Sequence, residues 1–491
     1  GLATRVFTAV ALGLNKKLKM GDWRGAYQTA PARDKQSVVA LLPREMWPQS
    51  WIEKYPEGSQ IVCPVKKSLY GRVRAGYDFD YFASQQLQGL GWRPLYDIEE
   101  ALYVHDTPEG ASPDGLLRYV DDTLFACEES TIKEREEETS RIFVQPPLED
   151  PNGKKFVGST LEYEVIEELD GGHKVYSIQW NQTELIDEMV EKYEEKYGTV
   201  PVRSTPAPAS DEHVPKTREQ EARECAKEAP YVYKAGLHKE DCQEYIGSTS
   251  YVEQHTRPDI SVANHTLQQN VAAWDEGDDR LLKWLIGYMK GTAKDKLTGY
   301  VSTKDFAENK VRQIVQTDAS HAGCRDSRMS TCGYAIYLVG PRTKILLSWG
   351  TKRLSTVSLS SCESELFGAQ HGSKIAIYVK LIVDGLRGHV TSILPQYGEY
   401  NVNDKAAGIE ETLEIDAEAA LKAIRNANST KLRHVRRTLG ISLAWLHKKW
   451  CNREESNMKH RKGTDLSADS QTKALSKAPL QRMKELLGLK S

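Results

Sequence analysis

The order of strand and helix signals in the last third of the chain constrains the fold more than any other feature. Three strand-like runs are followed by a long amphipathic helix, at Val311–Thr317, Gly333–Val339, Lys344–Trp349 and about Ser361–Leu386. Another strand signal and another helix signal come after this helix. Strands that alternate with long helices are typical of the α/β class. We therefore predict an α/β fold, with one domain over residues 310–491.

The first 300 residues divide into two further regions. Residues 1–155 mix short apolar runs with turn signals, and residues 156–305 combine a strand pair with amphipathic helices. The strands and helices of the second region are expected at Lys155–Val165, Lys174–Trp180, Thr183–Tyr197 and Arg280–Lys290. A polar tract with several prolines, at about 201–228, is typical of a linker or a surface insertion. A chain of 491 residues has room for three domains of this size.

Composition excludes several classes of protein. Hydrophobic residues make up 39% of the chain and charged residues 27%, as in ordinary soluble globular proteins. The longest apolar stretch near the start, Val6–Leu14, is far shorter than the roughly 20 residues of a membrane span. No secretory signal precedes it, and the eight cysteines form no C-x-x-C pair, which favours free thiols in a reducing compartment. We therefore expect neither secretion nor a membrane partner.

The near-neutral charge of the chain hides a strong asymmetry. Residues 421–491 contain 17 Lys and Arg against 5 Asp and Glu, a balance of +12, whereas the remaining residues carry −15 and the total is −3. A basic segment in an otherwise acidic chain indicates contact with a polyanion. A solvated helix face explains the charges equally well on this observation alone.

Two apolar runs flank an Asp-Asp pair within Leu116–Cys127, and this pattern predicts a β-hairpin with the two carboxylates at its tip. Adjacent carboxylates beside strand-forming residues are costly unless their charge is neutralised. An exposed turn is the simple explanation, because Asp is common in turns. The functional explanation is a divalent metal, since Mg²⁺ prefers oxygen ligands from carboxylates and phosphates.

Several motifs follow one another in an order that resembles the reverse transcriptase of copia-type retrotransposons. The polymerase motifs are Asp22 with Ala26-Tyr27, Lys67-Ser68-Leu69-Tyr70-Gly71, and Tyr119-Val120-Asp121-Asp122. Four further segments resemble landmarks of the same family, namely Phe156-Val157-Gly158, Thr205-Pro206, Arg257-Pro258-Asp259-Ile260 and Tyr288-Met289-Lys290-Gly291-Thr292. The resemblance covers nearly the whole chain. It implies the α+β palm of a reverse transcriptase at 1–155 and a thumb- or connection-like region at 156–305.

The resemblance assigns roles in polymerisation to five residues. Asp22, Asp121 and Asp122 would hold two Mg²⁺ ions, or Mn²⁺, that activate the primer hydroxyl and stabilise the leaving pyrophosphate. Tyr27 would lie under the sugar of the incoming nucleotide, although a core tyrosine on the same strand is the alternative. Arg74 takes the place of a family glutamine that approaches the template or nucleotide, so substrate handling is in question there.

The resemblance also implies a fingers region before the first catalytic aspartate. Only 21 residues precede Asp22, and the chain begins with Gly rather than Met. We therefore expect a chain that is truncated at its N-terminus, lacks most of the fingers and polymerises poorly.

A second acidic set in the last domain resembles the RNase H domain of the same polyproteins, which implies an RNase H-like domain with a mixed sheet. Asp318 ends a strand, Glu363 opens the long helix, and Asp404 and Asp469 match the other two carboxylates of the family. These four residues would hold two further Mg²⁺ ions. Lys405 replaces a family asparagine beside Asp404 and could weaken Mg²⁺ binding by repulsion.

Glu363 and Glu365 compete for one role in this set. Two residues along a helix correspond to a rotation of about 200°, so only one of the two can face the strand that ends in Asp318. Ser360 and Glu363 also fit an S-x-x-E capping box, which gives Glu363 a structural alternative. The family position favours Glu363, and Glu365 stays open.

The basic C-terminal segment supplies candidate contacts to nucleic acid. The candidates are Lys431, Arg433, His434, Arg436, Arg437, Lys448 and Lys449, with Arg461 and Lys462. His434 lies in a segment that resembles a conserved family motif, but a lone histidine is more often structural. The implied partners are an RNA template, an RNA–DNA hybrid, primer DNA, deoxynucleoside triphosphates and other segments of the same polyprotein.

The leading hypothesis is thus the reverse transcriptase and ribonuclease H portion of a copia-type Pol polyprotein, an intracellular protein of the cytoplasm, virus-like particles or nucleus. A nucleic-acid-binding remnant that has lost catalysis is the second hypothesis, favoured by the expected lack of fingers, Arg74 and Lys405. A scaffold without metals, which uses the fold for protein contacts, is the third.

Overall fold

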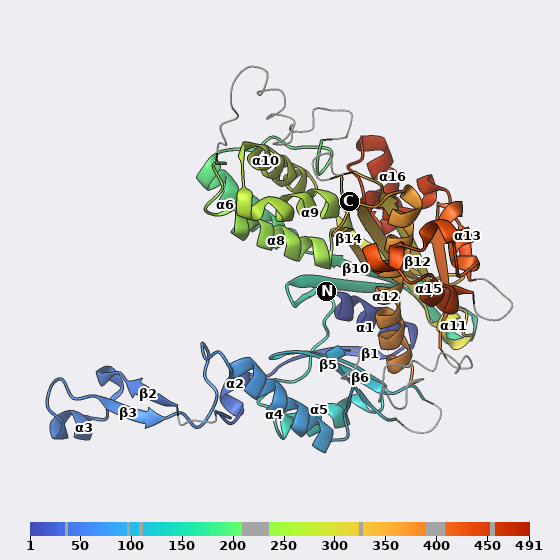
Figure 1. Ribbon diagram of the computed structural model, residues 1–491. Helices are drawn as coiled ribbons and strands as arrows, with labels where there is room; N and C mark the ends of the chain where they lie inside the picture. Colours follow the sequence, from blue (N-terminus) through green and yellow to red (C-terminus); the bar gives the residue numbers. More distant parts are fainter. Residues whose placement is uncertain are drawn as a thin grey trace. The chain divides into compact units, whose positions relative to one another are not determined.

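The computed structural model describes residues 1–34, 38–95, 99–107, 111–208, 235–323, 328–388, 408–451 and 457–491 (Figure 1). Contacts divide the chain into two compact units. The smaller unit is Lys16–Asp150, and the larger unit joins Gly1–Asn15 to Pro151–Ser491. Most of the polar tract predicted at 201–228 lies outside the described residues.

The smaller unit is built on a five-stranded antiparallel sheet with the order β1-β7-β6-β5-β4. The strands are β1 (Lys17–Asp22), β4 (Arg93–Leu95), β5 (Glu99–His105), β6 (Asp114–Tyr119) and β7 (Asp122–Cys127). Strands β6 and β7 confirm the hairpin predicted around the Asp-Asp pair. A separate two-stranded sheet pairs β2 (Val39–Leu42) with β3 (Ile61–Pro64).

Helices of the smaller unit bury aromatic and aliphatic side chains against this sheet. They are α2 (Ala26–Thr29), α4 (Ala75–Gly89) and α5 (Ile132–Ser140), whereas α3 (Gln49–Lys54) has no buried residue. Phe79, Ala83 and Leu87 recur every fourth residue along α4, so they share one helix face, and all three are fully buried. The ring of Trp23 stacks on Phe143 with centroids 3.7 Å apart. This core anchors the chain immediately after Asp22.

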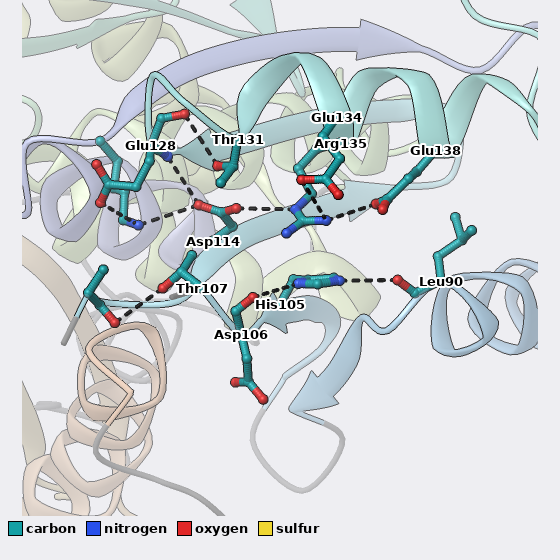
Figure 2. Close-up of polar contacts among 12 residues, drawn as sticks. Leu90, His105, Asp106, Thr107, Asp114, Glu128, Thr131, Glu134, Arg135 and Glu138 are labelled. Atoms are coloured by element: carbon teal, nitrogen blue, oxygen red, sulfur yellow. Dashed lines mark hydrogen bonds and ion pairs between the residues drawn. The ribbon is translucent and has the colours of Figure 1, made fainter. Parts of the chain in front are cut away.

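A buried carboxylate ties α5 to the sheet of the smaller unit (Figure 2). Asp114, which has no exposed surface, accepts hydrogen bonds from Arg135 Nε at 3.2 Å and from the backbone amide of Glu128 at 3.1 Å. Lys16 Nζ lies 3.4 Å from the same carboxylate. Arg135 in turn bonds Glu138 at 3.0 Å. Each buried charge is therefore paired, as a low-dielectric interior requires.

We expect the substitution Asp114→Asn to lower the free energy of unfolding of the smaller unit by about 3 kcal/mol, because Lys16 and Arg135 would lose the fully buried counter-charge that they share and keep only the more exposed Glu128 and Glu138. Asp106→Asn is the matched control. Asp106 is mostly exposed and pairs with Arg93 across 3.1 Å, so its loss should cost less than about 1 kcal/mol. Urea unfolding of both variants measures the difference, and equal costs would contradict a structural role for the Asp114 network.

The larger unit contains a ten-stranded mixed sheet with the order β16-β15-β12-β13-β14-β11-β10-β9-β8, and β17 pairs with β11 at its side. The strands are β8 (Lys154–Phe156), β9 (Ser159–Leu169), β10 (His173–Asn181), β11 (Lys296–Ser302), β12 (Arg312–Ser320), β13 (Thr331–Val339), β14 (Lys344–Arg353), β15 (Glu410–Ile415), β16 (Met458–His460) and β17 (Leu489–Lys490). Strand β15 runs parallel to both β12 and β16, whereas the other pairs are antiparallel. The predicted α/β class and the mixed sheet are confirmed.

The long helix α12 (Ser361–Leu386), which has the predicted bounds, crosses β12 and β13. Two glycines allow its close approach. A Cβ atom on Gly372 would lie 2.6 Å from Thr317 Cγ2, and one on Gly368 would lie 3.4 Å from the carbonyl oxygen of Asp318. The face of α12 that carries these glycines is therefore the face that meets β12. Glu365 lies three residues before Gly368 and seven before Gly372, so it shares that face.

The remaining helices of the larger unit pack on one another and on the sheet (Figure 1). Four of them form a separate hydrophobic core, α6 (Thr183–Tyr197), α8 (Cys242–His255), α9 (Ser261–Asn270) and α10 (Glu276–Gly291). The others are α1 (Leu2–Gly13), α11 (Thr303–Ala307), α13 (Glu418–Arg425), α14 (Val435–Thr438), α15 (Leu443–Trp450) and α16 (Lys477–Leu487). Across the described ranges, every helix is too short or too polar to cross a bilayer.

Candidate active sites

Three carboxylates of the larger unit converge at one end of its parallel strands. Strands β12 and β15 are in register with Gln316 opposite Glu414, so Asp318 and Asp416 occupy equivalent positions two residues further on. Glu365 approaches them from the buried face of α12. One carboxylate oxygen from each of the three lies within 4.8 Å of the others. Among the described residues, this is the one group of three or more such side chains that could hold a metal ion.

The electrostatics of this carboxylate cluster favour a bound cation. Burial, with the charges of Asp318 and Asp416, raises the pKa of Glu365 to about 9. Burial raises the pKa of Asp318 to about 6, and nearby Asp469 and Asp416 add to the effect. The pKa of Asp416 is raised as well, chiefly by burial. A divalent cation would remove the cost of placing these charges together.

Glu365 also has an unsatisfied oxygen. The side chain is 6% exposed, and its Oε2 atom has no hydrogen-bond partner in the described part of the chain. The backbone of Ala319 is a hydrogen-bond partner of the carboxylate. Buried carboxylate oxygens normally find a donor or a metal, so the donor set fits a hard divalent cation.

Asp469 lies beside the carboxylate cluster, where it contributes to the raised pKa values of Asp318 and Asp416. It forms an ion pair with Lys473, four residues later. The hydroxyl of Thr472 donates a hydrogen bond to Asp318 Oδ2. The segment after α15 and β16 thus brings one further carboxylate and one lysine to the cluster.

The structure brings Glu365 rather than Glu363 to the carboxylate cluster. Glu363 Oε2 accepts a hydrogen bond from the backbone amide of Leu359 at 2.9 Å, and its Oε1 lies 3.1 Å from His434 Nε2. The backbone amide of Glu363 donates to Ser360 Oγ at 3.3 Å. Glu363 therefore serves the start of α12, although its carboxylate bonds the amide of Leu359 rather than that of Ser360, so only one half of the predicted capping box is present.

Asp416 is a member of the cluster that sequence reasoning missed. The predicted Asp404 and its neighbour Lys405 lie outside the described residues, so their prediction is untested. A signal for Asp416 was present, because it follows the apolar alternation Leu413-Glu414-Ile415 and directly precedes the amphipathic helix α13. Asp318 likewise follows an apolar run, and β12 continues for two residues beyond it.

Without divalent cations, the carboxylate cluster should contribute less to the stability of the larger unit as pH rises from about 4 to about 9, whereas the buried His255 and His371, whose pKa values folding lowers from 6.5 to about 4, oppose this trend at the acidic end. Over that range the folded carboxylate cluster retains protons that the unfolded chain releases near pH 4, because folding raises the pKa of Asp318 to about 6 and of Glu365 to about 9. Thermal unfolding in EDTA across this range tests the slope. The substitution Glu365→Gln should flatten it, since glutamine stays neutral, and an unchanged slope would contradict the geometry of the cluster.

A second set of carboxylates lies in the smaller unit. Asp22 at the end of β1 pairs in register with Asp122 at the start of β7, and the backbone amide of Trp23 donates to the carbonyl of Asp121 at 2.9 Å. The tight turn before them holds Val120 at a φ of 57°, a left-handed conformation that is costly for a β-branched residue. Burial, then Asp121 and then Asp22, raise the pKa of Asp122. The three predicted carboxylates therefore lie close enough to influence one another.

The two predicted nucleotide contacts lie in the same unit. Burial and the charge of Asp121 raise the pKa of Tyr27, whose ring meets that of Tyr70 edge-on with centroids 4.8 Å apart. Arg74 is 43% exposed at its side chain, and its Nε lies 3.9 Å from the buried carboxylate of Asp78. Tyr27 is thus near the carboxylates, and Arg74 lies at the start of α4.

The predicted phosphate contacts are mostly exposed on the larger unit. These are Lys431, Arg433, Arg436, Arg437 and Lys448. Lys449 differs, because its Nζ is bonded to both carboxylate oxygens of Glu411 at 2.9 and 3.0 Å. His434 is partly exposed beside Glu363.

The fold and the carboxylate cluster define a mixed α/β protein with a candidate metal-dependent centre. Comparison with known proteins shows which proteins this chain resembles. No family model matches the chain. The chain is 34% identical over 125 residues to an uncharacterized mitochondrial protein of Arabidopsis thaliana, over 26% of this chain and 48% of that protein. It is 25% identical over 370 residues to the retrovirus-related Pol polyprotein from transposon TNT 1-94 of Nicotiana tabacum, over 72% of this chain and 24% of the polyprotein.

The relatives of this chain thus include retrovirus-related Pol polyproteins of transposons, which supports the resemblance to copia-type retrotransposons that the motifs indicated. The chain spans about half or less of the length of these curated relatives. Among solved structures, a foamy viral protease-reverse transcriptase in complex with RNA/DNA hybrid aligns over 92% of this chain and 45% of that chain, with 10% identity and a TM-score of 0.41.

Proposed function

We propose that the larger unit cleaves the RNA strand of RNA–DNA hybrids in a reaction that depends on two divalent metal ions. The observation that carries this proposal is the carboxylate cluster of Asp318, Glu365 and Asp416, with its unsatisfied buried oxygen on Glu365. The similarity to retrotransposon Pol polyproteins supports the choice of a nucleic-acid substrate.

Different residues of the chain would bind the metal ions and the nucleic acid. Asp318, Glu365 and Asp416 would hold the ions, with Asp469 at the edge of the site. Bound Mg²⁺ or Mn²⁺ supplies an activated water and stabilises the leaving oxygen. The exposed basic residues of 431–448 contact the phosphates of the hybrid, which is recognised through its helical shape and its 2′-hydroxyls.

The test is a cleavage assay on a labelled RNA–DNA hybrid, run once with millimolar Mg²⁺ and once with EDTA. We expect cleavage only with the metal and none of the DNA strand. Hybrid binding without cleavage would instead favour the second hypothesis, a nucleic-acid-binding remnant.

We propose further that the smaller unit is an RNA-directed DNA polymerase, with Asp22, Asp121 and Asp122 holding two Mg²⁺ ions. Tyr27 would contact the sugar of the incoming deoxynucleoside triphosphate, and Arg74 the template or the triphosphate. The register of Asp22 opposite Asp122 and the raised pKa of Asp122 support this assignment.

Primer extension on an RNA template tests the polymerase proposal. We expect Asp122→Asn to lower extension by about 100-fold or more, because one metal ligand would lose its charge. Asp80→Asn is a matched control, since Asp80 is 61% exposed at its side chain and pairs with Arg118. Equal extension by the two variants would contradict the role of Asp122.

A further inference from the structure

Three serine hydroxyls form a closed ring behind the start of α12. Ser330 Oγ lies 2.7 Å from Ser358 Oγ and 2.9 Å from Ser364 Oγ, and Ser358 Oγ lies 2.7 Å from Ser364 Oγ. All three are buried, with at most 3% of their surface exposed. They come from the segment before β13, the segment before α12 and the first turn of α12.

One arrangement of the hydrogen atoms satisfies every hydroxyl of this serine ring. Each hydroxyl has one hydrogen to donate. Ser364 donates to Ser330, a contact shorter than its 3.4 Å alternative to the carbonyl of Ser360. The ring closes if Ser330 donates to Ser358 and Ser358 donates to Ser364. Every hydroxyl hydrogen is then used, and each oxygen can accept one more.

The remaining acceptor positions face two donors. The backbone amide of Ala322 donates to Ser330 Oγ at 3.0 Å. His321 Nδ1 lies 3.2 Å from both Ser358 Oγ and Ser364 Oγ. In this arrangement the ring leaves no hydroxyl hydrogen for His321, so His321 Nδ1 is the atom that carries a hydrogen and donates it. The histidine is itself exposed.

The serine ring joins the two segments that carry metal-binding carboxylates. His321 and Ala322 belong to the turn that follows Asp318 at the end of β12, and Ala322 is held at a left-handed φ of 50°. Ser364 directly precedes Glu365 on α12. A network with every hydrogen satisfied holds its members in a single geometry.

We propose that His321, in its Nδ1–H tautomer, and the serine ring form a positioning unit that sets Glu365 against Asp318. The proposal rests on the metal site of the proposed function. His321 acts through the ring and touches neither metal nor substrate. Groups that orient metal ligands commonly affect metal affinity by about 10- to 100-fold.

The tautomer is measured directly by long-range ¹H–¹⁵N NMR of the protein with ¹⁵N-labelled histidine. The spectrum of His321→Asn, which lacks one histidine, assigns the signal. We expect His321 to be protonated at Nδ1 and unprotonated at Nε2. The opposite tautomer would overturn the proposal whatever the protein catalyses.

Two substitutions then test the effect on the metal site. Mn²⁺ binding is detected by electron paramagnetic resonance, and all proteins carry Asp122→Asn so that the carboxylates of the smaller unit bind Mn²⁺ less. His321→Asn keeps an N–H donor near the position of Nδ1 and should bind Mn²⁺ within about 2-fold of the parent. His321→Leu has no donor and should bind about 10-fold more weakly. Because residue 321 is exposed, both variants should unfold near the parent temperature.

Equal Mn²⁺ affinity of the Asn and Leu variants would overturn the positioning role. If the parent itself bound no Mn²⁺ and cleaved no hybrid, the proposed function would fail, and the tautomer measurement would still decide whether the serine ring exists as described.

Discussion

The substitution Glu365→Gln is expected to lower the rate of RNA–DNA hybrid cleavage by about 100-fold or more, whereas Glu363→Gln should lower it only a few-fold. Glu365 lies in the carboxylate cluster with a buried oxygen that has no partner in the described residues. Glu363 instead accepts a backbone hydrogen bond at the start of α12, and glutamine can still accept that bond.

The two variants form a matched pair, since both glutamates are buried, on the same helix and two residues apart. Initial rates at saturating Mg²⁺ measure the effect, and thermal unfolding establishes that both variants are folded. A larger loss for Glu363→Gln would overturn the assignment that the structure favours and restore the one that the family position favoured.

The substitution Asp416→Asn should have an effect of similar size, about 100-fold or more, because Asp416 would no longer supply a charge to ions that the carboxylate cluster would hold. Asp404→Asn, the change at the position predicted from the family motif, should leave most of the activity in place if Asp416 fills that role. The same assay compares the two variants.

An additional readout separates metal binding from catalysis. The concentration of Mn²⁺ at half-maximal binding should rise for Asp416→Asn, since the cluster loses one of its charges. Loss of cleavage by Asp404→Asn with unchanged activity of Asp416→Asn would show that the carboxylate cluster at the strand ends is not the catalytic centre.

Local sequence patterns predicted the regular elements well. The helices α6 and α12 begin and end at the predicted residues, and the hairpin of β6 and β7 brackets Asp121. These elements are specified by periodicity and by residues near their ends, such as Ser360, whose side chain caps α12. Information of this kind is contained within a few turns of chain.

The candidate hydrolytic site was predicted only in part. Asp318 was identified because it ends an apolar run and matches the first carboxylate of the RNase H domain that the segment resembles. The choice between Glu363 and Glu365 depended on which face of α12 meets the sheet, and Gly368 and Gly372 decide that face through their close contacts with β12. Sequence spacing alone could only show that the two glutamates point in different directions.

Asp416 escaped prediction for a related reason. Its place opposite Asp318 follows from the parallel pairing of β12 with β15, two strands separated by about 90 residues of chain. Strand order and register are set by the packing of the whole sheet. Lys449 was predicted to contact phosphates, but its Nζ bonds Glu411 on β15. This contact joins distant segments of the chain, so the sequence did not indicate it.

The sequence by itself determined the class of the protein, several of its helices and strands, and the relationship to retrotransposon Pol polyproteins, because motifs and periodicities are local. Only the tertiary structure decided which carboxylates share one site. Metal-ligand geometry is a matter of a few ångströms between residues on different elements, and in this chain the pairing of β12 with β15 and the face of α12 set those distances.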